Sequence, residues 1–306
     1  MARDTIRRSA ESRPSRERLT WAPDVPALHA DVDGIGIRYV SVGSGRPVVL
    51  LHSLRTQLDM FQKVIPSLAE RFRVLAPDLP GHGHSDAPDA DYDAEFFVAS
   101  VARLLERLDV RDAIVVGESI GATIALVLAA RHDPHVGRVV AINPYDYDRG
   151  RGLRRSSALA NVVLGVAAVP LIGEAFTRLA PYPVLRRILE GGVSRRESFS
   201  SGLLRELHAA GKAAGHTRAF VRLVRHWPSW ERLRGEYASI ELPVLLLYGE
   251  HDWSREDERD ADRRSIPGAR PRVVAGAGHF LSIEAPEAVV RAVDEIAADE
   301  STRAGA

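Results

Sequence analysis

Short apolar runs alternate along this chain with longer segments whose apolar residues recur with a helical period. Segments 96–108 and 120–131 have this period, and in the first the charged residues lie away from the apolar stripe. The runs that predict strands are residues 36–42, 47–52, 73–77, 113–117, 138–143, 243–249 and 272–275. Strands that alternate with helices in this way indicate a mostly parallel sheet.

Two of the predicted strands, VVLL at 48–51 and VLLL at 244–247, are apolar at every position. A strand with two apolar faces has to be covered by other elements on both sides. We therefore expect an α/β architecture in which helices pack on both faces of the sheet.

The alternation stops between about residues 145 and 237. Here the sequence shows no convincing strand pattern, and helical segments such as 203–212 and 218–226 are separated by Gly and Pro. Because this stretch separates a strand ending at Asn143 from one beginning at Pro243, it should lie over the carboxyl ends of the strands, where open α/β folds bind ligands. We expect a helical cap at 145–237 and a core made of 25–144 and 238–297.

The N-terminal segment, residues 1–24, is rich in arginine and is predicted to be disordered, because it has too little apolar surface to offset the entropy of ordering. It lacks the apolar core of a secretory signal, so we expect cytoplasmic residence. The most apolar stretch, residues 158–173, is shorter than the roughly 20 residues of a membrane-spanning helix. No membrane span is therefore expected.

Composition narrows the function classes further. Of the 306 residues, 41 are Lys or Arg and 41 are Asp or Glu, so no overall field would attract nucleic acid or an anionic membrane. Cysteine is absent, which excludes disulfides, thiolate metal sites and cysteine nucleophiles. A small molecule is the expected partner, and the sequence leaves a homodimer open.

The segment Gly117-Glu118-Ser119-Ile120-Gly121 follows an apolar strand and leads directly into a predicted helix. A strand, G-x-S-x-G and a helix in this order are typical of a nucleophilic serine on a sharp turn, where side chains at the glycine positions would collide. Ser119 is the candidate nucleophile, and we assign no catalytic role to Glu118.

A serine hydroxyl needs a base to accept its proton and a carboxylate to orient that base. Asp252 and His279 each follow a predicted strand, so that the chain order is Ser, Asp, His. Asp146 and Asp148, which follow the strand at 138–143, are alternative acids. These positions predict a triad of Ser119, His279 and one of the three carboxylates, with Asp252 preferred.

Together these motifs resemble the α/β-hydrolase superfamily, in its serine-nucleophile branch with a helical cap, over residues 25–297. DLPGHGHSD at 78–86 and the strand at 47–52 add to the resemblance. It implies an eight-stranded, mostly parallel sheet, a cap inserted after the sixth strand, and no metal or organic cofactor. It also implies an oxyanion hole formed by the backbone N–H groups of Leu54 and Ile120. The family usually has His-Gly in the first of these loops, whereas this chain has His52-Ser53.

Three features bear on the substrate. The nearly uniform apolar segment at 159–169 would either line an apolar pocket or form the core of the cap, and Trp253 would frame the pocket. Arg55, beside the oxyanion loop, would either bind a substrate carboxylate or phosphate or be solvated. The apolar segment favours a small apolar or aromatic acyl substrate.

The expected reaction is transfer of an acyl group from an ester, thioester or lactone to water through an acyl-enzyme. The resemblance also leaves open a carbon–carbon bond hydrolase, a lyase or a cofactor-free perhydrolase that uses the same residues, and a non-enzymatic ligand receptor on the same fold. Serine at position 119 argues against the haloalkane dehalogenases and epoxide hydrolases of the superfamily, which have aspartate there.

Overall fold

A single sheet of nine strands organises the molecule, seen in a computed structural model that describes residues 13–170 and 172–299. The spatial order is β1-β2-β3-β5-β4-β6-β7-β8-β9. Neighbours from β5 through β9 are parallel, and β1, β2 and β3 add an antiparallel edge. The strands are β1 (Arg13–Leu19), β2 (Ala22–Val32), β3 (Ile35–Val42), β4 (Pro47–Leu51), β5 (Arg73–Pro77), β6 (Ala113–Glu118), β7 (Val136–Ile142), β8 (Val244–Gly249) and β9 (Arg270–Val274).

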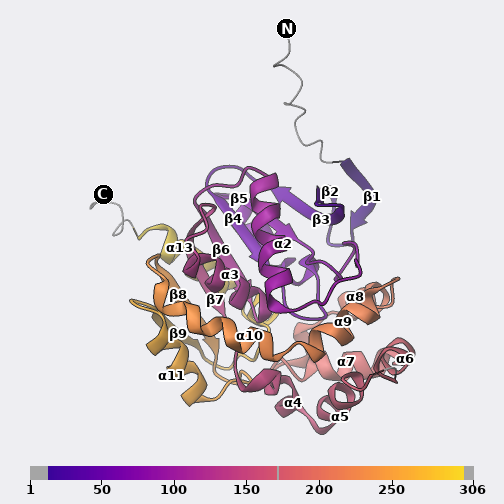
Figure 1. Cartoon of the computed structure of the whole chain (residues 1–306). Helices are drawn as coiled ribbons and strands as arrows, with labels where there is room; N and C mark the ends of the chain where they lie inside the picture. Colours follow the sequence, from indigo (N-terminus) through magenta and orange to yellow (C-terminus); the bar gives the residue numbers. More distant parts are fainter. Residues whose placement is uncertain (1–12, 171, 300–306) are drawn as a thin grey trace.

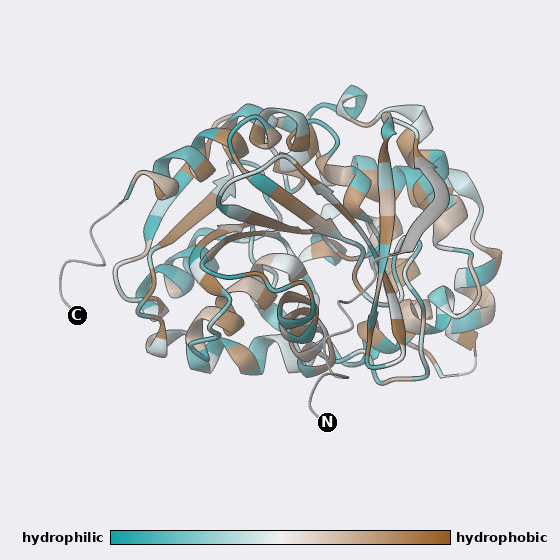
Figure 2. Ribbon diagram, turned by 90° about the horizontal axis from the view of Figure 1, so that it is seen from above, coloured by the Kyte–Doolittle hydropathy of each residue, from teal (hydrophilic) through white to brown (hydrophobic). Residues whose placement is uncertain are grey.

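Helices cover both faces of this sheet, as the fully apolar strands predicted. On one face, α3 (Ile120–Ala130) packs over β6 and β7 and is buried along its whole length, and α2 (Ala94–Arg107) packs against α3 and β2. On the other face lie η1 (Leu58–Phe61), α1 (Ile65–Ala69) and α13 (Pro286–Ala297). Figure 2 shows hydrophobic residues concentrated in the central strands, and hydrophilic and hydrophobic residues alternating along the surrounding helices. Alternate residues of β4, β5, β6, β7 and β8 enter the two cores.

The chain between β7 and β8 is helical, and no strand is formed by residues 143–170 or 172–243. Figure 1 shows α4 to α9 gathered at one end of the molecule, while α10 and η4 pack against α3. We call residues 148–239 the helical insertion. It contains η2 (Asp148–Gly150), α4 (Gly152–Ser156), α5 (Ala158–Ala167), α6 (Ile172–Leu179), α7 (Tyr182–Glu190), η3 (Arg196–Ser198), α8 (Ser201–Ala210), α9 (His216–Arg225), α10 (Pro228–Leu233) and η4 (Arg234–Ser239).

The predicted mostly parallel sheet is confirmed, and each of the seven predicted strands is present. The prediction of disorder was wrong for residues 13–24, which form β1 and the start of β2. Residues 1–12 lie outside the described residues. Leu19 is fully buried, and the indole N–H of Trp21 donates to Asp59 over 2.7 Å. Because β1 has no apolar alternation and is paired through its backbone with β2, the hydropathy pattern gave no sign of it.

Within the described ranges, no helix is both long and apolar enough to cross a bilayer.

Candidate active site

Ser119 occupies the sharp turn between β6 and α3, with φ 61° and ψ −119°. Positive φ is strained for a residue with a side chain, and such strain is typical of functional turns. A Cβ at residue 117 would lie 2.1 Å from the carbonyl oxygen of Gly121, and one at residue 121 would lie 2.2 Å from that of Leu51. Only glycine fits at both positions, so the two glycines allow β6, α3 and β4 to approach closely enough to present Ser119.

His279 and Asp252 meet at the carboxyl ends of β9 and β8. The His279 Nδ1 atom lies 2.5 Å from Asp252 Oδ1, and both side chains are fully buried. Burial raises the pKa of Asp252, but its interactions with His279 and with Ser254 outweigh burial and leave this pKa below its ordinary value. Asp252 therefore stays ionised and fixes the orientation of the imidazole.

The second ring nitrogen of His279, Nε2, is buried and has no hydrogen-bond partner among the described residues. The ring stacks on Trp253 at 3.8 Å between centroids, and Tyr145 and Phe280 pack edge-on against it. These three aromatic residues line the same pocket as Ser119. Ser119 therefore lines the pocket and His279 packs against the aromatic lining of the same pocket, without a direct hydrogen bond between the two side chains. Contacts of this kind often tighten only when substrate binds.

Neither alternative acid approaches the imidazole. Asp146 is buried and accepts a hydrogen bond from the Tyr237 hydroxyl over 2.5 Å, and burial raises its pKa. Asp148 forms an ion pair with Arg155 at 2.6 Å. Of the three candidate carboxylates, Asp252 is the one that contacts His279.

Hydrogen bonds from distant residues hold the acid and histidine loops together. Asn143, at the end of β7, accepts from the Gly249 N–H over 3.0 Å and donates to the His279 carbonyl over 2.8 Å. Glu118 accepts from the N–H and the hydroxyl of Ser282, which lies shortly after His279 in the chain. Sequence reasoning missed Asn143, and its position at a strand end was the only signal available.

The helical insertion also supports the histidine loop. The carbonyl oxygen of Gly192 accepts from the His279 N–H over 2.7 Å, and a Cβ at residue 278 would lie 2.7 Å from that oxygen. The buried Glu284 carboxylate accepts from the N–H groups of Gly278 and Arg195, each over 2.7 Å. One carboxylate therefore joins the loop to the segment after α7. No sequence pattern pointed to this link.

The oxyanion loop is fixed without the usual glycine. The Ser53 carbonyl oxygen lies 2.8 Å from His52 Nδ1 and accepts from the Thr56 hydroxyl over 2.7 Å. His52 Nε2 accepts from the Leu79 N–H, and burial lowers the pKa of His52, so Nδ1 carries the proton and donates to Ser53. Because that carbonyl shares a peptide plane with the Leu54 N–H, fixing the oxygen also fixes the direction of the Leu54 donor.

The second expected donor, Ile120, is the first residue of α3, where N–H groups lack intrahelical partners. Ser53, Leu54 and Ser119 line one pocket. Leu54 therefore lies in the pocket that Ser119 lines, and Ile120 follows Ser119 directly in the chain.

Comparison with known proteins identifies the family of this chain. A model of the alpha/beta hydrolase fold family matches residues 46–286, a range that includes Ser119, Asp252, His279, Leu54 and Ile120. The chain belongs to this family.

Named relatives of this α/β-hydrolase differ in what their names say they act on. A 2-(acetamidomethylene)succinate hydrolase from Mesorhizobium japonicum is 27% identical over 285 residues, which cover 90% of this chain and 98% of the relative. A haloalkane dehalogenase from Mycobacterium marinum is 30% identical over 295 residues, covering 88% and 91%. Wild-type Cfl2 from Burkholderia cenocepacia has a similar structure, with a TM-score of 0.79 at 25% identity over 92% of this chain and 99% of that one. Membership therefore establishes the fold and a hydrolase family, but leaves the reaction to the site.

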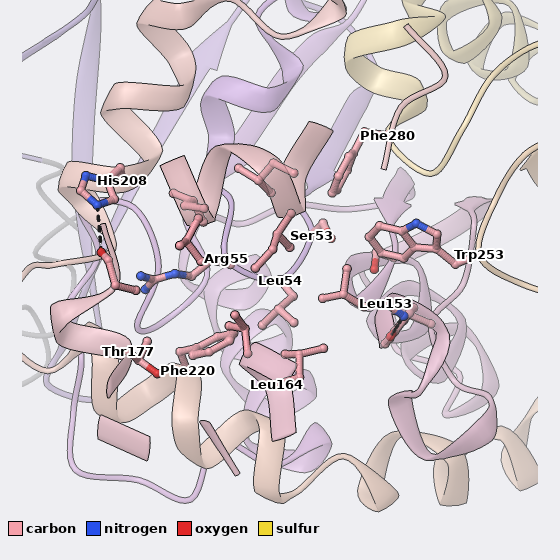
Figure 3. Close-up of a pocket in the computed structure, with 18 residues that line it drawn as sticks. Ser53, Leu54, Arg55, Leu153, Leu164, Thr177, His208, Phe220, Trp253 and Phe280 are labelled. Carbon is pink, nitrogen blue, oxygen red and sulfur yellow. Dashed lines mark hydrogen bonds between the residues drawn. The ribbon is translucent and has the colours of Figure 1, made fainter. Parts of the chain in front are cut away.

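The pocket of this α/β-hydrolase lies between the sheet loops and the helical insertion (Figure 3). Trp253 stacks on His279 and donates its indole N–H to the Gly191 carbonyl over 3.2 Å. Val163 and Leu164 of α5 line the pocket, whereas Val162 on the same helix is 59% exposed. The apolar segment predicted at 159–169 thus contributes one face to the pocket and exposes another.

Among the described residues, no cluster of three or more His, Asp or Glu could hold a metal ion.

Proposed function

We propose that this α/β-hydrolase is a serine hydrolase that cleaves an ester, thioester or lactone-type acyl bond of a small substrate through an acyl-enzyme. The observation that carries the proposal is the imidazole of His279. One nitrogen is bound to an ionised Asp252, and the other is buried, unpartnered among the described residues, and beside the pocket that Ser119 lines. A base held in this state is suited to accept a proton from a nearby hydroxyl.

In the proposed reaction, Ser119 Oγ attacks the substrate carbonyl and His279 Nε2 takes the hydroxyl proton. The N–H groups of Leu54 and Ile120 stabilise the oxyanion that develops. His279 then protonates the leaving group, and the bond between the carbonyl carbon and that group breaks. A water molecule, deprotonated by His279, attacks the acyl-enzyme. His279 then returns the proton to Ser119 Oγ as the bond between that oxygen and the acyl carbon breaks, and the acid is released. Asp252 stabilises the imidazolium in both halves of the reaction.

The helical insertion acts as a cap in this proposal. Its lining side chains are mostly aliphatic or aromatic, which favours an apolar or aromatic acyl group. It also closes the pocket against water, which strengthens electrostatic interactions with the reacting atoms. The serine at 119 supports an oxygen nucleophile of the alcohol type, in contrast to the carboxylate expected of a haloalkane dehalogenase such as the relative named above.

The test is covalent labelling with a fluorophosphonate probe, followed by assay of a panel of p-nitrophenyl esters, lactones and ring-cleavage diketones. We expect labelling of the wild type at Ser119, and loss of both labelling and turnover in Ser119→Ala. Matched thermal unfolding curves would show that the variant is folded. Full retention of turnover in Ser119→Ala would end the proposal, and turnover of the diketones alone would move it to the carbon–carbon hydrolases.

A further inference from the structure

One charged side chain enters an otherwise largely apolar pocket. In Figure 3, Arg55 lies on the same side of the view as Thr177 and His208, and Trp253 lies on the opposite side. Arg55 directly follows the oxyanion residue Leu54 and has a positive φ of 60°. Backbone strain of this kind in a residue with a side chain directs attention to function.

The guanidinium is held in place but has no counter-charge. It donates to the Gly211 carbonyl over 2.8 Å, and its central carbon lies 5.2 Å from the centre of the Phe220 ring. It forms no ion pair with any carboxylate of the described residues. Burial lowers the pKa of Arg55 to about 10, so the group is still protonated at neutral pH. The bond to Gly211 uses one of its five N–H donors.

A second polar group of the pocket also lacks a partner. The Thr177 side chain is 5% exposed, lines the pocket and has no hydrogen-bond partner for its hydroxyl among the described residues. Buried hydroxyls are usually satisfied. An unpaired cation and an unpaired hydroxyl in one apolar pocket are the complement of an anion carried on an apolar stem.

We propose that Arg55, with Thr177, binds a carboxylate on the substrate, remote from the scissile carbonyl. This inference rests on the proposed function and specifies its substrate class: half-esters of dicarboxylic acids, or lactones that carry a carboxylate chain. A carboxylate fits better than a phosphate monoester, because one guanidinium and one hydroxyl offer few donors and a single positive charge. The alternative is that Arg55 only ties the oxyanion loop to Gly211 and Phe220 of the helical insertion.

A matched substrate pair separates these two roles. One substrate is the p-nitrophenyl monoester of glutaric acid, and the other is the same ester with its free carboxylate capped as a methyl ester. We expect the wild type to prefer the acid. Arg55→Met, which keeps length but removes charge, should lower kcat/KM for the acid by about 10- to 100-fold and change that for the capped ester by less than about threefold.

Further variants sharpen the test. Arg55→Lys should partly restore the preference for the acid, and Thr177→Val should reduce it several-fold. Arg222→Met is the control, because Arg222 pairs with Asp89 at 2.6 Å and is not part of the pocket lining. An equal loss on both substrates in Arg55→Met would show a structural role and overturn the inference. Tighter binding of a phosphonate than of the carboxylate would overturn the choice of anion.

Failure of this inference and failure of the proposed function are distinguishable. If the wild type hydrolyses both esters but Arg55→Met leaves their ratio unchanged, only the carboxylate site is rejected. If no ester is hydrolysed, glutarate binding to the wild type and to Arg55→Met can still be compared by calorimetry. Weaker binding to the variant would support the anion site without the reaction, and equal binding would reject it.

Discussion

The two walls of the pocket are built on different principles. The sheet wall carries Ser119, Asp252 and His279 on loops after parallel strands, and its positions are fixed by backbone contacts that tolerate no added Cβ. The wall from the helical insertion consists of side chains on short helices, such as Val163 and Leu164 of α5. The comparison indicates that the chemistry depends on backbone geometry, whereas selectivity depends on side chains that can be exchanged.

The largest effect is expected when Asp252, the carboxylate of the sheet wall, is replaced. Asp252→Asn should lower kcat about 10⁴-fold, because an amide favours the wrong tautomer of His279 and does not stabilise the imidazolium. Asp146→Asn is the matched control, since the side chain of Asp146 is also buried but is bonded to Tyr237 instead of His279. Steady-state kinetics on one activated ester measures both. An equal loss in Asp146→Asn would contradict the assignment of Asp252.

A smaller effect is expected where the loops of the sheet wall are joined. Asn143→Leu removes the bonds to Gly249 and His279 at similar side-chain volume, and should lower kcat about 100-fold through misplacement of the base. Asn161→Leu, at an exposed position of α5, should leave kcat unchanged. The separation of kcat from KM is the measurement. A change confined to KM would argue against a positioning role for Asn143.

Substitutions in the wall from the helical insertion should change substrate selectivity and leave the catalytic rate largely unchanged. Val163→Ala widens the pocket and should shift the ratio of kcat/KM between long and short acyl esters on the order of tenfold, while kcat for acetate changes little. Val162→Ala makes the same change at an exposed position of the same helix and serves as control. If the two variants have the same acyl-chain profile, α5 does not form the specificity wall.

The smallest expected effect concerns stability rather than rate, behind the sheet wall. Burial raises the pKa of Asp146, so the folded protein holds this proton more tightly than the unfolded chain. The resulting stabilisation is complete below the unfolded pKa, about 3.9, and is lost as the pH rises through the folded pKa.

Asp146→Asn cannot lose this proton. The free energy of unfolding of the variant should therefore increase relative to that of the wild type as the pH rises above about 4. The difference between the two should reach about 1.4 kcal/mol for each unit by which the pKa of Asp146 is raised. Urea unfolding between pH 4 and pH 8 measures the difference. Parallel pH profiles for the two proteins would show that the carboxyl group has an ordinary pKa.

The same contrast explains what the sequence could predict. Residues of the triad follow apolar strands or sit between glycines, so local patterns pointed to them. Asn143 and Glu284 act through hydrogen bonds to residues far away in the chain, and no local pattern contains that information. Strand β1 has the same limitation, because RPSRERL has no alternation and is ordered by pairing with β2. Which residues of α5 face the pocket is set by the rotation of the helix about its axis. A uniformly apolar segment does not specify that rotation, so the sequence did not predict these residues.

The bond between the Gly192 carbonyl and the His279 N–H has a consequence for protein engineering. Grafting a foreign lid onto this scaffold is an attractive way to obtain new selectivities, and the short stretch from Gly192 to Arg195 would usually be discarded with the rest. Without it, His279, the proposed general base, would lose one of the hydrogen bonds that hold its loop. A chimera that retains these few residues and exchanges only the helices before and after them has the better chance of remaining an active catalyst.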